Sequence, residues 1–392
     1  ASADVTLNLK DATLDAAKLN WRKGPGVPAT ATLSVDLADD HVRAIREATL
    51  KGAGADAHVS LAFGDGGAIQ RVDAPRLILG ETDASGSIVG RKEGGWQVNL
   101  RGLSFDATGL MADLGRSAGP EANSPLVVDA AVDRLILGPK REARAVKGQV
   151  YSDGVHWQAA SLDATLFGGG KASLRFGEAG GARNFRLSSG DFGGLLRVLG
   201  LSDNVTGGEI EIAGQAKDQG ARRVFSGKVD GRNYRLVNAP LFAKLLAVAS
   251  FSGIAGLLSG EGIPFTHLTA DFVVADDKIE FKDARAYGGA IGVNASGSYD
   301  MPLNLLEVSG TLVPAYSINS VLGNVPLLGP ILLGGEGEGI FGANFKIAGP
   351  AADPTITVNP LSALAPGVLR KLFLFEAPQP AATPAAPPAP MQ

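Results

Sequence analysis

The sequence lacks cysteine and is poor in aromatic and charged residues, which make up 6% and 19% of its 392 residues. Without cysteine, disulfides, thiol catalysis and cysteine-ligated metals are excluded, and the compartment stays undecided between the cytosol and an export route that avoids thiols. The formal net charge of −4 argues against nucleic acid as a partner, because nucleic-acid-binding proteins usually present a basic surface. Glycine is abundant, with 53 residues, and indicates tight turns and bulges between many strands.

The length allows about two or three ordinary domains or one elongated repeat structure. The chain begins at Ala1 within an alternating segment and shows neither an initiator methionine nor a signal peptide. We therefore expect it to be the later part of a longer protein, or a processed one.

Alternation of apolar and polar residues predicts β-strands along most of the chain. The clearest predicted hairpin joins residues 161–167 to 171–176 through the triplet Gly168-Gly-Gly170, which supplies positive φ. Residues 39–48 could instead form one short helix. The pattern divides the chain into a first β-meander over residues 1–115, a second over 126–235, a C-terminal segment over 236–375 and a disordered Ala/Pro-rich tail over 376–392.

A strand that runs into a glycine and then into a short leucine-rich segment recurs along the chain. The four units cover residues 98–115, 185–200, 225–246 and 307–323, with uneven spacing. Repeated units of this kind stack into an extended sheet that no single unit could stabilise.

One apolar segment, residues 241–258, interrupts the strand pattern and has Lys244 as its only charge. Pro240 lies near the start of this segment and Gly260 lies just after its end, as is usual for a helix. These positions favour a helix that packs on the sheet or on a lipid surface over a helix that spans a membrane. Capping of the sheet and contact with a membrane stay open for this helix. The side chains concerned are Phe242, Leu245, Leu246, Phe251, Leu257 and Leu258. A last amphipathic helix is expected over residues 361–375.

No motif makes a positive case for catalysis. Gly337-Glu-Gly-Ile-Phe-Gly342 matches a dinucleotide-binding glycine pattern, but an alternating strand follows it where a helix is required. The four histidines are scattered without the spacing of a metal site, and no nucleophile elbow, P-loop or distinct carboxylate pair is present. We therefore predict a protein without enzyme activity, catalytic residues, metal site or cofactor.

The remaining feature is an apolar face on each predicted strand of the C-terminal segment. Two such faces could close on each other in a sandwich, which the pattern alone favours, or one curled sheet could leave its concave face open for acyl chains. The candidate lipid-binding side chains are Leu268, Phe272, Val274, Ile279, Phe281, Ile291, Val293, Leu306, Val308 and Leu312.

Several motifs of the C-terminal half resemble the AsmA-like family, and most closely its YhdP-like branch. They include Phe242-Ala-Lys-Leu-Leu246, Gly262-Ile-Pro-Phe265, Asp283-Ala-Arg-Ala286, Val313-Pro-Ala-Tyr-Ser-Ile-Asn-Ser320, Leu322-Gly-Asn-Val-Pro-Leu-Leu-Gly329, Gly334-Gly-Glu-Gly-Glu-Gly339 and Asn359-Pro-Leu-Ser-Ala-Leu-Ala-Pro-Gly367. The resemblance is dense over residues 225–372 and rests on the repeat pattern alone over 1–224.

This resemblance implies a bridge-like lipid transport protein of the Gram-negative envelope. The implied fold is mainly β: a long, twisted antiparallel sheet curled into a hydrophobic groove, with a few short helices. The implied partners are phospholipid and, at the C-terminal end, a membrane surface or an envelope protein, with no nucleic acid. The implied location is the periplasm, with an inner-membrane anchor in a missing N-terminal part. The alternative hypothesis is a non-catalytic scaffold or adhesin of the envelope, and a third hypothesis is an undetected hydrolase.

Overall fold

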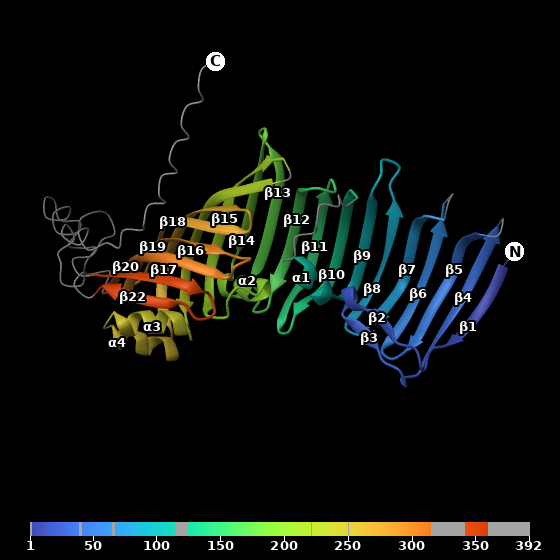
Figure 1. Cartoon of the computed structure of the whole chain (residues 1–392), viewed down its shortest axis with the longest axis horizontal. Coiled ribbons are helices and arrows are strands. Elements are labelled where there is room, and N and C mark those ends of the chain that lie inside the picture. The colour runs from blue at the N-terminus through green and yellow to red at the C-terminus, as the bar shows by residue number, and fades with distance from the viewer. Residues whose placement is uncertain are drawn as a thin grey trace, which may run out of the picture.

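The computed structural model describes residues 2–38, 41–64, 67–114, 124–220, 222–249, 251–314 and 342–359. Within these residues, twenty strands form one long twisted sheet that does not close into a barrel, with a few short helices beside it (Figure 1). The expected mainly β fold with a single curled sheet is confirmed, and the two-sheet sandwich that the pattern alone favoured is wrong.

The sheet runs from β1, at the N-terminal end, to β22, with each strand beside the next in sequence apart from β2 and β3 (Figure 1). In the first part the strands are β1 (Ser2–Asn8), β4 (Ala29–Ala38), β5 (His41–Gly52), β6 (Ala55–Phe63), β7 (Ile69–Leu79), β8 (Thr82–Gly90) and β9 (Trp96–Asp106). The second part contains β10 (Leu126–Gly138), β11 (Arg141–Ser152), β12 (Trp157–Leu166), β13 (Lys171–Ala179), β14 (Ala182–Ser189), β15 (Val205–Gln219), β16 (Arg222–Leu236), β17 (Ile263–Ala275), β18 (Lys278–Tyr287), β19 (Ile291–Asp300), β20 (Leu305–Pro314), β21 (Ala343–Pro350) and β22 (Thr355–Asn359).

Strands β9 and β10 pair in parallel, whereas the other pairs in the described part of the sheet are antiparallel. A parallel pair needs a crossover connection, and this one contains the helix α1 (Thr108–Leu114). The predicted boundary near residues 116–125 falls at this crossover. It divides the sheet into two meanders, β1 to β9 and β10 to β22.

The short helix expected over residues 39–48 is wrong, because residues 41–48 belong to β5. Val42 and Ile45 of this strand pair with Leu37 and Val35 of β4, and Ile45 also pairs with Leu61 of β6. Pairing with a strand on either side outweighs the helical tendency of the local sequence. The predicted glycine hairpin is confirmed, since Gly168 and Gly169 adopt φ values of 104° and 89° between β12 and β13.

Short elements lie along one long edge of the sheet, which we call the capped edge (Figure 1). β5, β9 and β16 end at this edge. The elements there are β2 (Leu14–Ala16), η1 (Ala17–Leu19), β3 (Trp21–Lys23), α1, α2 (Phe192–Leu199), α3 (Pro240–Val248), α4 (Ser252–Ala255) and η2 (Gly256–Ser259). The strands β4, β8 and β15 end at the opposite edge, which we call the open edge.

Three of the four predicted strand–glycine–leucine units end in these caps, namely β9 with α1, β14 with α2 and β16 with α3. The fourth runs out of the described residues after β20. In α2 the Asp191 carboxylate accepts a hydrogen bond from the Gly194 amide at 2.9 Å, and Gly200 ends the helix in the left-handed region. In the described residues, α1 lies mainly against η1 and β10, α2 against β15 and β11, and α3 against α4 and β22, so each cap packs mainly on strands other than the one that leads into it.

A buried lysine stabilises the first cap, which consists of β2, η1 and β3. The Lys23 ammonium donates to the carbonyls of Lys10, Ala12 and Gly24 at 3.1, 2.8 and 3.0 Å, which satisfies its three donors inside the cap. The Trp21 indole nitrogen donates to the Ala53 carbonyl at 3.1 Å and ties the cap to the turn after β5.

Candidate functional site: an apolar groove

One face of the sheet is apolar from the first strand to the last, and we call it the groove face. Directly paired residues on neighbouring strands point to the same face, so the pairing register shows which side chains share it. One row on this face contains Leu7, Ala31, Leu50, Ala57, Leu77, Ala84, Gly102, Val132 and Val146. A second contains Gly148, Leu162, Leu174, Leu187, Ile212, Val229 and Ala270. A third continues through Phe272, Phe281, Gly297, Val308, Ile347 and Ile356.

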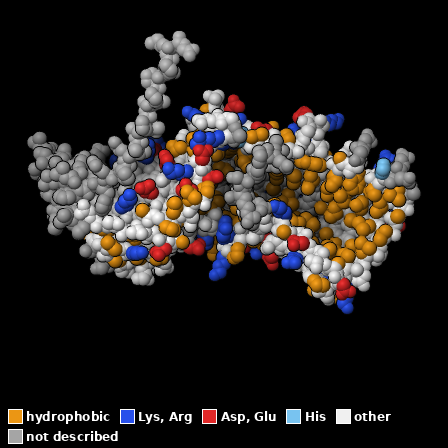
Figure 2. All heavy atoms as spheres, in the orientation of Figure 1, with side chains coloured by type: hydrophobic (Ala, Val, Ile, Leu, Met, Phe, Trp, Pro, Cys, Tyr) orange, Lys and Arg blue, Asp and Glu red, His pale blue; other side chains and the backbone are white. Residues whose placement is uncertain are grey.

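In the first meander, burial on the groove face falls from the capped edge to the open edge. In β4, Ala29 is 5% exposed at the capped edge and Leu37 is 36% exposed at the open edge, and in β7 Leu79 and Ile69 are 6% and 43% exposed. Figure 2 shows the result as hydrophobic side chains gathered in a hollow over β4 to β9. The groove is thus closed along one side and open along the other.

The ten side chains predicted to bind lipid all lie on the groove face of β17 to β20. Pairs such as Phe272 with Phe281 and Val293 with Leu312 lie side by side in the register. Ile291 and Leu312 are fully buried, whereas the other eight are half-buried. Ile291 and Leu312 belong to the core that the cap forms with the sheet, so the eight others form the accessible part of this surface. Lipid binding by them stays a prediction.

The segment predicted as one apolar helix over residues 241–258 is divided into α3, α4 and η2. Leu245, Leu246 and Leu258 are buried in the core cluster with Ile263 and Ile291 of the sheet. Phe242 and Phe251 are partly buried against the same cluster, and Leu257 is exposed. Five of the six predicted contact side chains therefore pack in the cap. None of the helices in the described part of the chain is long and apolar enough to cross a membrane.

The groove narrows in the second meander around four phenylalanine rings, Phe176, Phe185, Phe225 and Phe272, which we call the phenylalanine cluster. The centroids of Phe176 and Phe225 are 6.4 Å apart, and those of Phe185 and Phe272 are 6.2 Å apart. Each of these pairs joins strands three positions apart in the sheet, which would lie about 14 Å from each other if the sheet were flat. The groove face is therefore concave, with its sharpest curl at β13 to β17.

Two glycines form the floor beneath these rings. Gly214 of β15 and Gly227 of β16 are paired with each other and lie in one row between Phe185 and Phe272. A Cβ on Gly214 would lie 2.8 Å from the Phe185 ring and 2.1 Å from the Ser226 carbonyl oxygen. The rings meet over these positions because no side chain stands there.

A cluster of three charged side chains lies at the open edge, next to the phenylalanine cluster. Arg183 of β14 and Arg223 of β16 both donate to the Asp218 carboxylate of β15. Arg223 also donates to the Trp157 carbonyl of β12, four strands away, and its guanidinium carbon lies 5.4 Å from the Phe176 ring centroid. We call these three charged residues the arginine clasp. The hydrogen bond from Arg223 lowers the pKa of Asp218 to about 2.

Neither the clasp nor the phenylalanine cluster was predicted from the sequence. Arg223 and Trp157 are 66 residues apart, and no local pattern brings them together. The alternation of Phe225 with Gly227 and Val229 places these residues on one face, but it carries no information on curvature.

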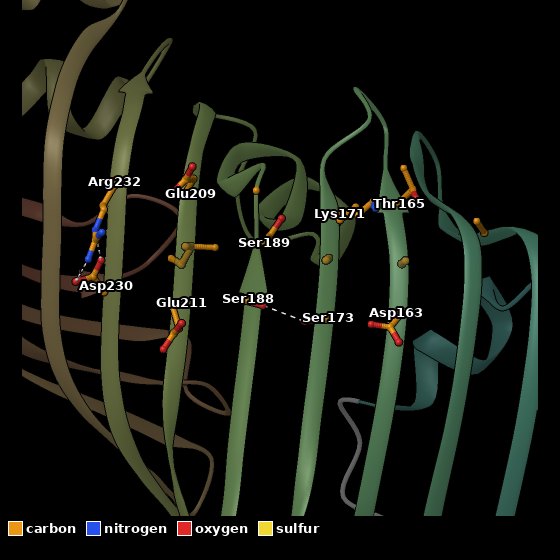
Figure 3. Close-up of a pocket in the computed structure, with 15 residues that line it drawn as sticks. Asp163, Thr165, Lys171, Ser173, Ser188, Ser189, Glu209, Glu211, Asp230 and Arg232 are labelled. Carbon is orange, nitrogen blue, oxygen red and sulfur yellow. Dashed lines mark hydrogen bonds and ion pairs between the residues drawn. The ribbon is translucent and has the colours of Figure 1, made fainter.

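The opposite, outer face is polar. Figure 3 shows part of it, where Asp163, Ser173, Ser188, Glu211 and Asp230 lie in one row across β12 to β16. The Ser173 and Ser188 hydroxyls are 2.9 Å apart and share a hydrogen bond. Ion pairs with neighbouring arginines balance the acids of this row, as Arg175 does for Asp163 at 2.8 Å. Within the described ranges, no group of histidine and acidic residues could hold a metal ion.

Comparisons of the chain with protein-family models, with curated proteins and with solved structures found no match. The fold and the two faces of the sheet are therefore the observations on which a function can be proposed.

Proposed function

We propose that this chain is a segment of a lipid-transfer protein that carries phospholipid between the inner and outer membranes along its groove face. The observation that carries the proposal is the apolar groove face, whose rows of paired side chains cross the twenty sheet strands of the described residues and are accessible from one edge. Apolar patches of this extent on soluble proteins mark sites for a ligand or a partner. The AsmA-like sequence features support the same function independently.

The geometry suits an acyl chain better than a compact ligand. Twenty strands extend over roughly 90 Å along the sheet, about three times the hydrocarbon thickness of a bilayer. Each buried CH₂ group contributes about 0.8 kcal/mol, so a lipid is held firmly against escape into water. Movement along the groove costs little, because each apolar contact that is lost is replaced by a similar one in the next row. Direction then requires a gradient or a partner.

The C-terminal end is where we place contact with a membrane surface or an envelope protein. Val248 of α3 and Leu257 of η2 are 50% and 43% exposed on this cap, and their exposure supports the proposal. The proposal also includes a periplasmic location and an inner-membrane anchor in a further N-terminal part of the protein. A non-catalytic scaffold or adhesin is the alternative, and it requires no lipid in the groove.

Phe272 and Val273 offer a matched test because they are adjacent on β17 and point to opposite faces. Phe272 lies in the groove, and Val273 is 40% exposed on the outer face, where it pairs with Ser226 and Glu280. We expect native mass spectrometry of the purified protein to find bound phospholipid, Phe272→Asp to lose it and Val273→Asp to keep it, because a carboxylate in the groove would have to be desolvated.

Circular dichroism of both variants would separate loss of lipid from loss of fold. Wild-type protein that is free of lipid and takes up none from vesicles would contradict the proposal and favour the scaffold. Equal lipid loading of Phe272→Asp and wild type would show that the lipid lies elsewhere.

A further inference from the structure

Among the described residues, the arginine clasp is the charged cluster that lies over the groove face where the groove narrows. We propose that Arg183 and Arg223 form a binding site for the phosphate of a lipid headgroup at this constriction. The inference rests on the proposed function, since it assigns a headgroup contact to the same groove.

The charges of the clasp point to an anion. Two guanidiniums share one carboxylate, and the further acceptor of Arg223 is the uncharged Trp157 carbonyl. Glu178 pairs with Arg183 in the register but is exposed and forms no ion pair with it in the described structure. The clasp therefore keeps a net positive charge in a site where the Arg223 side chain is only 8% exposed. A charge held away from water in this way gains from a second anionic partner.

The donors that a phosphate needs are available. Arginine has five N–H groups in a planar fork that matches phosphate geometry. Arg183 uses one nitrogen on Asp218, and its side chain is 26% exposed, so it can make the first contact. The phosphate would then take the place of the Trp157 carbonyl as acceptor for Arg223, which releases the contact between β12 and β16. Binding of the headgroup therefore also widens the mouth of the groove.

The position relative to the apolar surface fits a phospholipid. Arg223 stacks on Phe176 and lies two residues from Phe225 on the same face of β16. A phosphate on the clasp is therefore at the open edge, in contact with water, while the attached acyl chains lie on the phenylalanine cluster. Free inorganic phosphate has the same charge chemistry but no acyl chains, so the two sources can be told apart.

The test compares dioleoyl phosphatidic acid with dioleoylglycerol, which has the same acyl chains and no phosphate, on delipidated full chain. We expect wild type to bind phosphatidic acid about tenfold more tightly in native mass spectrometry titrations, as one charge-assisted contact predicts. Arg183→Gln with Arg223→Gln should abolish this preference, whereas dioleoylglycerol should still bind to the double variant. Arg175→Gln, which breaks the outer-face ion pair with Asp163, is the matched control and should keep the preference.

Each outcome decides a different point. An unchanged preference in the double variant would overturn the phosphate site and leave the lipid groove intact, whereas failure of both lipids to bind wild type would overturn the proposed function itself. Inorganic phosphate that binds as tightly as phosphatidic acid in calorimetry would assign the clasp to free anions. Arg183→Gln alone keeps the Arg223 bridge and should lose part of the preference, which guards against misfolding of the double variant.

Discussion

The two meanders use the same alternation of apolar and polar residues but build different stretches of groove. In the first meander the groove face is mainly aliphatic and wide, and side chains such as Val42 and Ile69 are more than two-fifths exposed at the open edge. In the second, rings from strands three positions apart meet and an arginine bridges β12 to β16. The comparison shows that curl, and not hydrophobic pattern, decides whether an apolar sheet face becomes an open trough or a narrow channel.

The physical cause of the curl lies in small residues. The row Phe185, Gly214, Gly227 and Phe272 places large side chains on either side of two positions without any. The strands bend over these positions until the rings touch, which buries apolar area that a flatter sheet would leave in water.

The largest expected difference in stability between the meanders comes from placing a carboxylate on the groove face of each. We expect Phe225→Asp to lower the free energy of unfolding by about 3 kcal/mol or more, because it removes a packed ring and leaves a charge among apolar side chains. Val42→Asp lies at the open edge of the first meander and should change stability by less than about 1 kcal/mol. Urea denaturation followed by circular dichroism measures both. Similar losses for the two variants would show that the meanders do not differ in packing.

A smaller effect is expected from filling the floor of the phenylalanine cluster. Gly214→Val would place a Cβ within 2.1 Å of the Ser226 carbonyl oxygen, so the strands must separate, at about 1–3 kcal/mol. Gly177 of β13 is the matched control, because the nearest atom to its added Cβ is 3.9 Å away. Gly177→Ala should therefore be close to neutral. Hydrogen exchange should report faster amide exchange in β14 to β17 of Gly214→Val and no change in β4 to β8. Uniform exchange along the sheet would contradict a local origin of the curl.

The fold was largely predictable from the sequence because alternation is a local property. The groove-face positions of Leu268, Phe272 and Val274 follow from period two alone, and the recurring strand–glycine–leucine pattern marks β9, β14 and β16, the strands that lead into the caps. The errors have non-local causes. The sequence of 39–48 suits a helix until β4 and β6 pair with it on both sides.

The narrowing of the groove at the phenylalanine cluster and the arginine clasp could not be predicted either, because its contacts are also non-local. Its contacts join β12 to β16 and β14 to β17, and they exist only after the sheet has curled. A glycine pair between phenylalanine rows is the one signal in the sequence that could have indicated it, and it is visible only once the register is known.

The smallest expected effect is a pH dependence that separates the clasp from the rest of the groove. The hydrogen bond from Arg223 lowers the pKa of Asp218 to about 2, below the usual 3.8 of an aspartate side chain. A carboxyl whose pKa is lower in the folded state stabilises the fold above its unfolded pKa, and this stabilisation is lost as the pH falls from about 4 towards 2. Because the pair is partly exposed and screened, we expect about 1 kcal/mol.

Comparison with Asp218→Asn isolates this contribution from those of the other carboxylates. The melting temperature of wild type should exceed that of Asp218→Asn at pH 7, and the difference should shrink once the pH falls below about 4. A difference that stays constant over this range would mean that Asp218 acts through packing and not through its charge. In that case the narrow channel is held by the phenylalanine cluster alone, and the clasp is free to open for a ligand without loss of stability.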